Sequence, residues 1–237
     1  MIKFLLAPFI VISLFSAAVT ASEPEQRPVL VELFTSQGCA NCPGANEFLA
    51  GLSERKDVIA ISLAVDYWDY LGWKDTYAMS EFTKRQAVYG KTLHTRRPYT
   101  PQVIINGQTS VKGTRKRKVL KAIKAAQKNL TAAPEISFVR LSDKMQLSIG
   151  AGEVPKAGVA IIIADYMPGV QHIEVTDGDN SGKTLDQVNM VTKLHQVGVW
   201  NGEAMVIDLP LVQSGSCVVI LQEAGQGKVL AAGRLQN

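Results

Sequence analysis

Two cysteines between Gln37 and Pro43 are the residues of this chain best suited to chemistry. Cys39 and Cys42 stand three positions apart, after an apolar run and at the expected start of a helix. Unpaired N–H groups and the dipole at a helix start favour the thiolate, the nucleophilic form of cysteine. A thiol three residues later can release a mixed disulfide. The segment therefore predicts a redox pair, with Cys39 as nucleophile and Cys42 as the resolving group.

The same pair has two other interpretations, a structural disulfide and a metal site. A bridge across two residues closes too small a loop to stabilise a fold much. Zinc would need two more ligands, and the chain has one further cysteine, Cys217, and three histidines, none at ligand spacing. We therefore expect no metal and no cofactor, and an apolar run from Cys217 onward predicts a buried free thiol. Redox exchange and a little-used bridge both stay open.

The elements that must position the cysteines follow an alternating pattern between residues 28 and 130. Asn106 and Gly107 form a strong hairpin signal, and Thr114 can cap a final helix. The pattern predicts strands over 29–35, 58–65, 102–105 and 109–112, and helices over 43–52, over 80–89 and after residue 114.

This order, with a Cys-x-x-Cys after the first strand, resembles the thioredoxin fold. The resemblance implies that Thr100 and Pro101 belong to the site, because Pro101 stands where that fold carries a cis-proline facing the cysteines. It also implies a proton-transfer role for Glu32, which lies close to where thioredoxins bury an acid. Gly38 replaces the usual tryptophan before the first cysteine, so a thioredoxin-like potential is not assumed.

The segments 32–39 and 65–75, together with Arg85 and Gln86, resemble more closely a secreted bacterial family known as domain of unknown function 1223. That family is thioredoxin-like in its first part. The resemblance covers most of the chain and is strongest from Glu32 to Gly107. It implies a fold and a redox centre, but no substrate.

Aromatic side chains gather just after the second predicted strand, between Asp66 and Asp75. In parallel α/β units this end of a strand is a functional end. Tyr67, Trp68 and Trp73 would there bind a substrate polypeptide beside Cys39. The alternative, which we favour, is that these rings pack as a lid between two domains, since so many exposed aromatics would be costly.

The first 21 residues predict a secretory signal peptide. Lys3 precedes an apolar run that ends in small residues suitable for cleavage after Ala21. Cleavage would lower the net charge from +4 by the one charge of Lys3, to +3. We therefore expect an exported protein, periplasmic or secreted, with no nucleic-acid partner and no stable membrane association after cleavage.

Residues 22–132 are expected to form the α/β thioredoxin-like domain, and residues 133–237 a second, all-β domain. Short strand-like runs with turn signals between them predict an antiparallel sandwich there. Residues 177–182 look like the opening of a calcium loop, but Val188 stands where a glutamate is needed, so a hairpin turn is preferred.

Two groups of basic residues have different expected roles. Arg96 and Arg97, with His94, lie near the predicted cis-proline and would favour a thiolate at the cysteines. The run from Arg115 to Lys118 predicts a solvated helix face.

The most concrete function consistent with these patterns is an exported thiol–disulfide oxidoreductase. Its partners would be protein or peptide thiols and disulfides, and one of them would be a redox partner protein. The alternative is a binding module that keeps the fold and whose Cys39–Cys42 pair is structural or little used.

Overall fold

The computed structural model describes residues 27–95, 97–130, 133–211 and 216–235. The predicted signal peptide, Arg96, and residues 131–132 next to the predicted domain boundary lie outside the described residues. Within these ranges, no helix has the length and apolarity that a membrane crossing requires.

The first half confirms the predicted order of strands and helices. A short 3-10 turn within residues 66–75, which we call the aromatic segment, was not predicted. The elements are β1 (Val29–Thr35), α1 (Pro43–Ser53), β2 (Val58–Ala64), η1 (Asp69–Leu71), α2 (Ser80–Thr92), β3 (Gln102–Ile105), β4 (Thr109–Lys112) and α3 (Lys116–Gln127).

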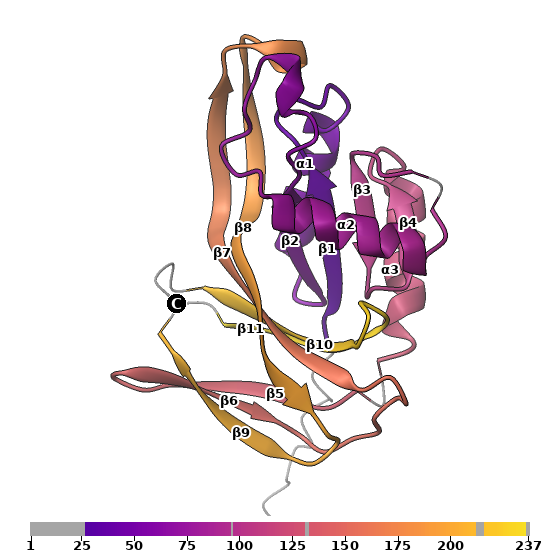
Figure 1. Ribbon diagram of the computed structural model, residues 1–237, viewed down its shortest axis with the longest axis vertical. Helices are drawn as coiled ribbons and strands as arrows, with labels where there is room; N and C mark the ends of the chain where they lie inside the picture. Colours follow the sequence, from indigo (N-terminus) through magenta and orange to yellow (C-terminus); the bar gives the residue numbers. More distant parts are fainter. Residues whose placement is uncertain (1–26, 96, 131–132, 212–215, 236–237) are drawn as a thin grey trace, which may run out of the picture.

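The second half is antiparallel, as expected, and is dominated by one long hairpin. The elements are β5 (Ile136–Arg140), β6 (Lys144–Ile149), β7 (Val159–Val175), η2 (Gly178–Asn180), β8 (Lys183–Trp200), β9 (Met205–Pro210), β10 (Cys217–Glu223) and β11 (Val229–Leu235). Strands β7 and β8 pair over almost their whole length, and we call their far end, residues 170–188, the arm. Figure 1 shows the arm reaching beyond the rest of the sheet, to the loop that follows β2.

Strands from both halves form one eight-stranded sheet in the order β11-β10-β7-β8-β2-β1-β3-β4. Strand β8 lies parallel beside β2, with Ser62 opposite Met190. The antiparallel strands of the predicted second domain are present, but β7, β8, β10 and β11 belong to the sheet shared with the first half. β2 is buried along its whole length, and β8 covers the edge that it would otherwise expose. The division at residues 132 and 133 stays a prediction.

The buried apolar side chains of the described residues form three cores. Helices α1 and α3 cover one face of the first-half strands, and α2 covers the other. The second sheet, β5-β6-β9, packs against β7 and β10 in the lower part of Figure 1. Cys217 lies in this last core as a buried free thiol, as predicted, and burial raises its pKa to about 12.

Candidate functional site

A disulfide joins Cys39 and Cys42 in the turn between β1 and α1. We call this turn, residues 36–42, the cysteine turn. Cys42 is the residue that caps α1, and Pro43 is the first residue of that helix, where a missing N–H costs nothing. The amide of Cys42 donates to the carbonyl of Cys39 over 3.0 Å, which closes the turn. The pair therefore lies at a helix start, as the spacing predicts.

Both cysteines are buried, which the sequence did not indicate. Cys39 is 1% exposed and Cys42 is fully buried, whereas Ala40 and Asn41 between them are exposed. A buried sulfur is less accessible to an attacking thiolate. The segments that cover this turn therefore matter as much as the cysteines themselves.

Gln37, two residues before Cys39, ties the turn to the loop after β2. Its amide N–H donates to a carboxylate oxygen of Asp75 over 2.7 Å, and its side-chain oxygen accepts from Trp73 Nε1 over 2.9 Å. Asp75 is buried, and burial raises the pKa of its carboxyl, while the N–H groups of Gln37 and Tyr77 oppose the rise. Asp75 was not among the predicted site residues.

The aromatic segment packs over the turn. The Trp68 side chain lies so near Gly38 that a Cβ added to Gly38 would sit 3.3 Å from Trp68 Cβ. The indole N–H of Trp68 donates to Thr100 Oγ1 over 2.8 Å, and Tyr67 and Trp68 contact the core beneath α2. Tyr67, Trp68 and Trp73 are half-buried, which favours the packing interpretation, and their substrate-binding role stays a prediction.

The tip of the arm also contacts the cysteine turn, through hydrogen bonds from Asn180. Asn180 is fully buried, and its side-chain amide donates to the carbonyls of Gln37 (2.8 Å) and Cys39 (3.0 Å). Gln187, also in the arm and fully buried, accepts from the Gln37 side chain over 3.0 Å. The turn at 177–182 is thus a hairpin turn, as preferred, and its contact with Cys39 was missed because turn residues signal only local structure.

The Thr100–Pro101 peptide bond is cis, as the resemblance implied. Pro101 is buried, and it lies close to the first turn of α1: a Cβ added to Gly113 would stand 2.9 Å from Pro101 Cβ and 3.0 Å from Ala45 Cβ. Thr100 is linked to the site through Trp68. The structure therefore brings both residues to the neighbourhood of the cysteine turn.

Glu32 lies in a buried polar cluster under α2. Its two carboxylate oxygens accept from Arg85 Nε over 2.7 Å and from the Tyr89 hydroxyl over 2.6 Å. Gln222 of β10 completes the cluster, since it accepts from Arg85 and donates to Tyr89. Burial alone would lower the pKa of Arg85, but the charge of Glu32 raises it above its ordinary value. These bonds give Glu32 a structural partner, and its proton-transfer role stays a prediction.

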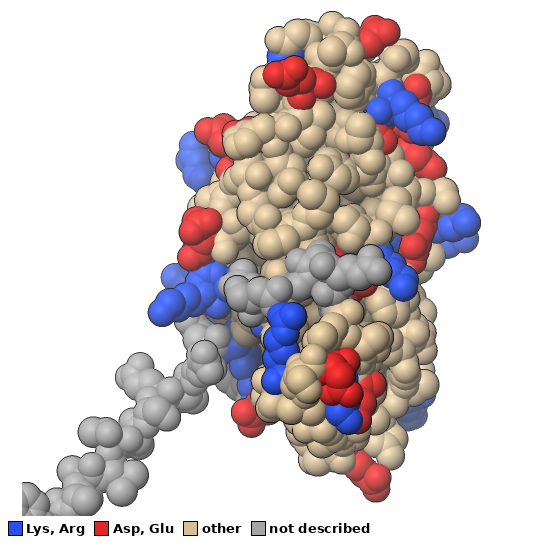
Figure 2. Space-filling model, turned by 90° about the vertical axis from the view of Figure 1, so that its left-hand side faces the viewer, with Lys and Arg blue, Asp and Glu red and all other residues tan. Residues whose placement is uncertain are grey.

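The remaining predicted features lie at the surface. His94 and Arg97 are exposed, and their effect on the cysteines stays a prediction. Among the described residues, no three or more His, Cys, Asp and Glu side chains gather in a way that could hold a metal ion. On the face in Figure 2, Lys and Arg are dispersed among Asp and Glu around a largely uncharged centre.

The family described as "Protein of unknown function (DUF1223)" matches residues 30–222, which include the cysteine turn, the cis-proline and the arm. The chain belongs to the DUF1223 family. The crystal structure of a structural genomics target from Agrobacterium tumefaciens is similar over 90% of this chain and 96% of its own, at 34% identity and a TM-score of 0.78.

A second solved structure shares the fold alone. HBP35 of Porphyromonas gingivalis matches 90% of this chain and 76% of its own, at 13% identity and a TM-score of 0.55. Among curated proteins, none matches. A disulfide at Cys-x-x-Cys spacing in this DUF1223 protein is compatible with a redox role and indicates an environment outside the reducing cytoplasm.

Proposed function

We propose that this protein is an exported thiol–disulfide oxidoreductase that works through Cys39 and Cys42. The observation that carries the proposal is the position of their disulfide, at the start of α1 and near a cis-proline. A helix start favours the thiolate of the first cysteine. The cis-proline would present the backbone of Thr100 to an extended substrate. Residues 1–21 act as the signal peptide that delivers the chain to an oxidising compartment.

A thioredoxin-like core for the first half is part of the proposal. Its support is the strand order β2-β1-β3-β4, with β1 parallel to β2 and antiparallel to β3. Helices α1 and α3 on one face and α2 on the other add to that support. On this basis we place the thioredoxin-like unit at residues 22–132 and the β-rich unit at 133–237, sharing one sheet.

The exchange begins, in the dithiol form, with attack of the Cys39 thiolate on one sulfur of a substrate disulfide. A Cys39–substrate bond forms, and the other substrate sulfur leaves as a thiolate. Cys42 then attacks the Cys39 sulfur and releases the second substrate sulfur. Two electrons pass to the substrate, the protons of Cys39 and Cys42 go to its sulfurs, and the Cys39–Cys42 disulfide is formed. The reverse sequence oxidises a substrate dithiol.

A different class of function is favoured by the burial of both sulfurs. A fold in which Cys39 and Cys42 are covered by the arm and the aromatic segment can also serve as a binding module with a resting bridge. The two functions differ in how readily the bridge exchanges. Structural bridges resist reduction by glutathione, whereas catalytic pairs do not.

The deciding experiment is the equilibrium reduction potential of Cys39–Cys42 in the protein without residues 1–21. Thiols are trapped by alkylation after incubation in graded glutathione or dithiothreitol buffers. We expect a potential above about −270 mV, in the range of exchangeable pairs. A potential below about −300 mV would support the binding module instead.

The roles of the two cysteines are separated by single substitutions. Cys42→Ser should accumulate a mixed disulfide between Cys39 and a model disulfide peptide, because the resolving thiol is missing. Cys39→Ser should form none. Cys217→Ala is the matched control, and it should exchange like the unchanged protein because that thiol is buried in a different core.

A further inference from the structure

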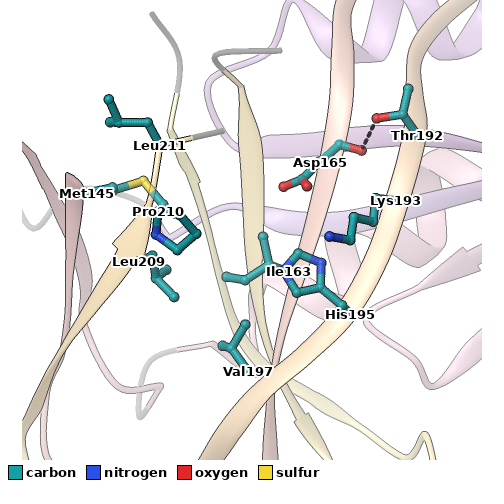
Figure 3. A pocket seen from close by; sticks show the side chains of 10 residues that line it. All are labelled: Met145, Ile163, Asp165, Thr192, Lys193, His195, Val197, Leu209, Pro210 and Leu211. Carbon is teal, nitrogen blue, oxygen red and sulfur yellow. Dashed lines mark hydrogen bonds between the residues drawn. The ribbon is translucent and has the colours of Figure 1, made fainter. Parts of the chain in front are cut away.

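A hollow remote from the cysteines lies between the two sheets. Its volume is about 520 Å³, which is the size of many small-molecule sites. In Figure 3, Met145 and Leu209 approach from the second sheet, and Ile163 and Val197 from β7 and β8. The hollow therefore has apolar walls on two sides.

One side of the hollow is polar. Asp165 of β7 lies opposite Lys193 of β8, and Ile163 lies opposite His195. Residues two apart on a strand share a face, so Asp165, Lys193 and His195 all belong to the face that lines the hollow. Figure 3 shows the three side chains grouped beside the apolar wall.

Two buried polar atoms in this group make no hydrogen bond within the described part of the chain. They are one carboxylate oxygen of Asp165, Oδ1, and the ring nitrogen Nδ1 of His195. The nearby Thr192 hydroxyl donates to the backbone carbonyl of Asp165, over 3.3 Å, and not to its carboxylate. Buried polar atoms are rarely left without a partner. Asp165 Oδ1, which as a carboxylate oxygen accepts hydrogen bonds, therefore points to a bound molecule with a donor group.

We propose that this hollow binds a small, uncharged, apolar molecule that carries one N–H or O–H group. The apolar body lies against Met145, Ile163 and Leu209, and the donor group faces Asp165 Oδ1. The opposite charges of Asp165 and Lys193 leave no net charge for an ionic ligand to match. Asp165 in particular disfavours an anion, and the apolar walls disfavour a hydrated ion.

The test uses N-phenyl-1-naphthylamine, a neutral aromatic probe with a single N–H group, whose fluorescence rises in an apolar site. We expect a saturable rise with one site per chain when the probe is added to the protein without residues 1–21. A rise that fails to saturate, or no rise, overturns the proposal.

Matched variants locate the probe. Val197→Trp should fill the hollow and weaken binding more than tenfold. Val199→Trp is the control, because Val199 lies on the same strand but is exposed and borders a different hollow. Leu209→Trp repeats the test from the opposite wall, in case Val197→Trp does not fold as judged by circular dichroism. Equal binding by a folded filled variant and by the control overturns the proposal.

The donor group is tested separately. Asp165→Ala should weaken binding of the probe about tenfold, which corresponds to about 1.4 kcal/mol. Binding as tight as that of the unchanged protein contradicts the assignment of Asp165 as the acceptor. The reduction state of Cys39–Cys42 should not change probe binding, so this proposal and the proposed redox function fail independently.

Discussion

At the scale of single residues, Glu32 shows how burial decides what a charged group does. The sequence places it beside the cysteines along the chain, and the resemblance implies proton transfer. In the structure both of its oxygens accept hydrogen bonds from α2, one from Arg85 and one from Tyr89. Arg85 is itself buried, so the pair holds two charges that water does not reach. Removing one charge leaves the other without compensation.

Glu32→Gln should therefore lower the free energy of unfolding by about 3–5 kcal/mol, because the Arg85 guanidinium keeps its charge in a buried site. Urea unfolding followed by circular dichroism measures the loss. Asp208→Asn is the control, since the Asp208–Lys144 ion pair is exposed and its loss should not be measurable.

The same variant tests the proton-transfer prediction. If Glu32 moves protons for Cys42, then the rate of thiol exchange in Glu32→Gln will depend on pH differently from that of the unchanged protein. An unchanged pH profile would contradict this role and leave Glu32 as the buried partner of Arg85 and Tyr89.

At the scale of elements, the arm is the feature that distinguishes this site from a bare helix start with two thiols. Its tip supplies Asn180, which binds the Cys39 carbonyl, and its second strand supplies Gln187, which binds Gln37. Buried hydrogen bonds tie the tip of the arm to Gln37 and Cys39, and Val188 at the base of the arm packs in the core that contains α1. Loss of the hydrogen bonds at the tip would favour local opening there.

Asn180→Ala should speed reduction of the Cys39–Cys42 disulfide by dithiothreitol about tenfold or more. The variant loses the two hydrogen bonds to the carbonyls of Gln37 and Cys39, of about 1 kcal/mol each, and every 1.4 kcal/mol is a factor of ten in the population of the open form. The measurement is the rate at which thiols become available to an alkylating reagent.

Asp179→Ala is the matched control, because Asp179 is the preceding residue of η2 and is exposed. It should be reduced at the unchanged rate. If Asn180→Ala is also reduced at that rate, the arm does not limit access to the disulfide.

The helices and strands of the first half could be predicted because the order of apolar residues within each segment shows which side chains will be buried. β1 is apolar and buried nearly throughout, and α3 places Val119 and Ile123 on one face. The contacts of the arm could not be predicted, because Asn180 and Cys39 are 141 positions apart and a turn carries no sign of what it touches. The burial of the cysteines depends on those same contacts and was missed for the same reason.

At the scale of the whole molecule, the two halves share both a sheet and a core. Strand β8 pairs with β2, and the core under α2 contains Val218 and Ile220 from β10. Gln222 of β10 accepts a hydrogen bond from Arg85, the buried partner of Glu32. Sequence patterns show where each strand lies but not which distant strand it will pair with, so two separate domains were the natural expectation. The shared core predicts instead that neither half is stable without the other.

Cooperative unfolding tests this expectation, since the three tryptophans report on both halves: Trp68 and Trp73 on the first and Trp200 on the second. A variant with Trp68→Phe and Trp73→Phe retains only the second reporter, and Trp200→Phe retains only the first two. Within each variant, tryptophan fluorescence and far-ultraviolet circular dichroism should give the same urea midpoint, because a shared sheet unfolds as a unit. Comparing two probes inside one variant removes any effect of the substitution itself on stability. Midpoints that differ between probes would show that the halves unfold separately, and the arm would then be a contact between two domains that can part without either losing its fold.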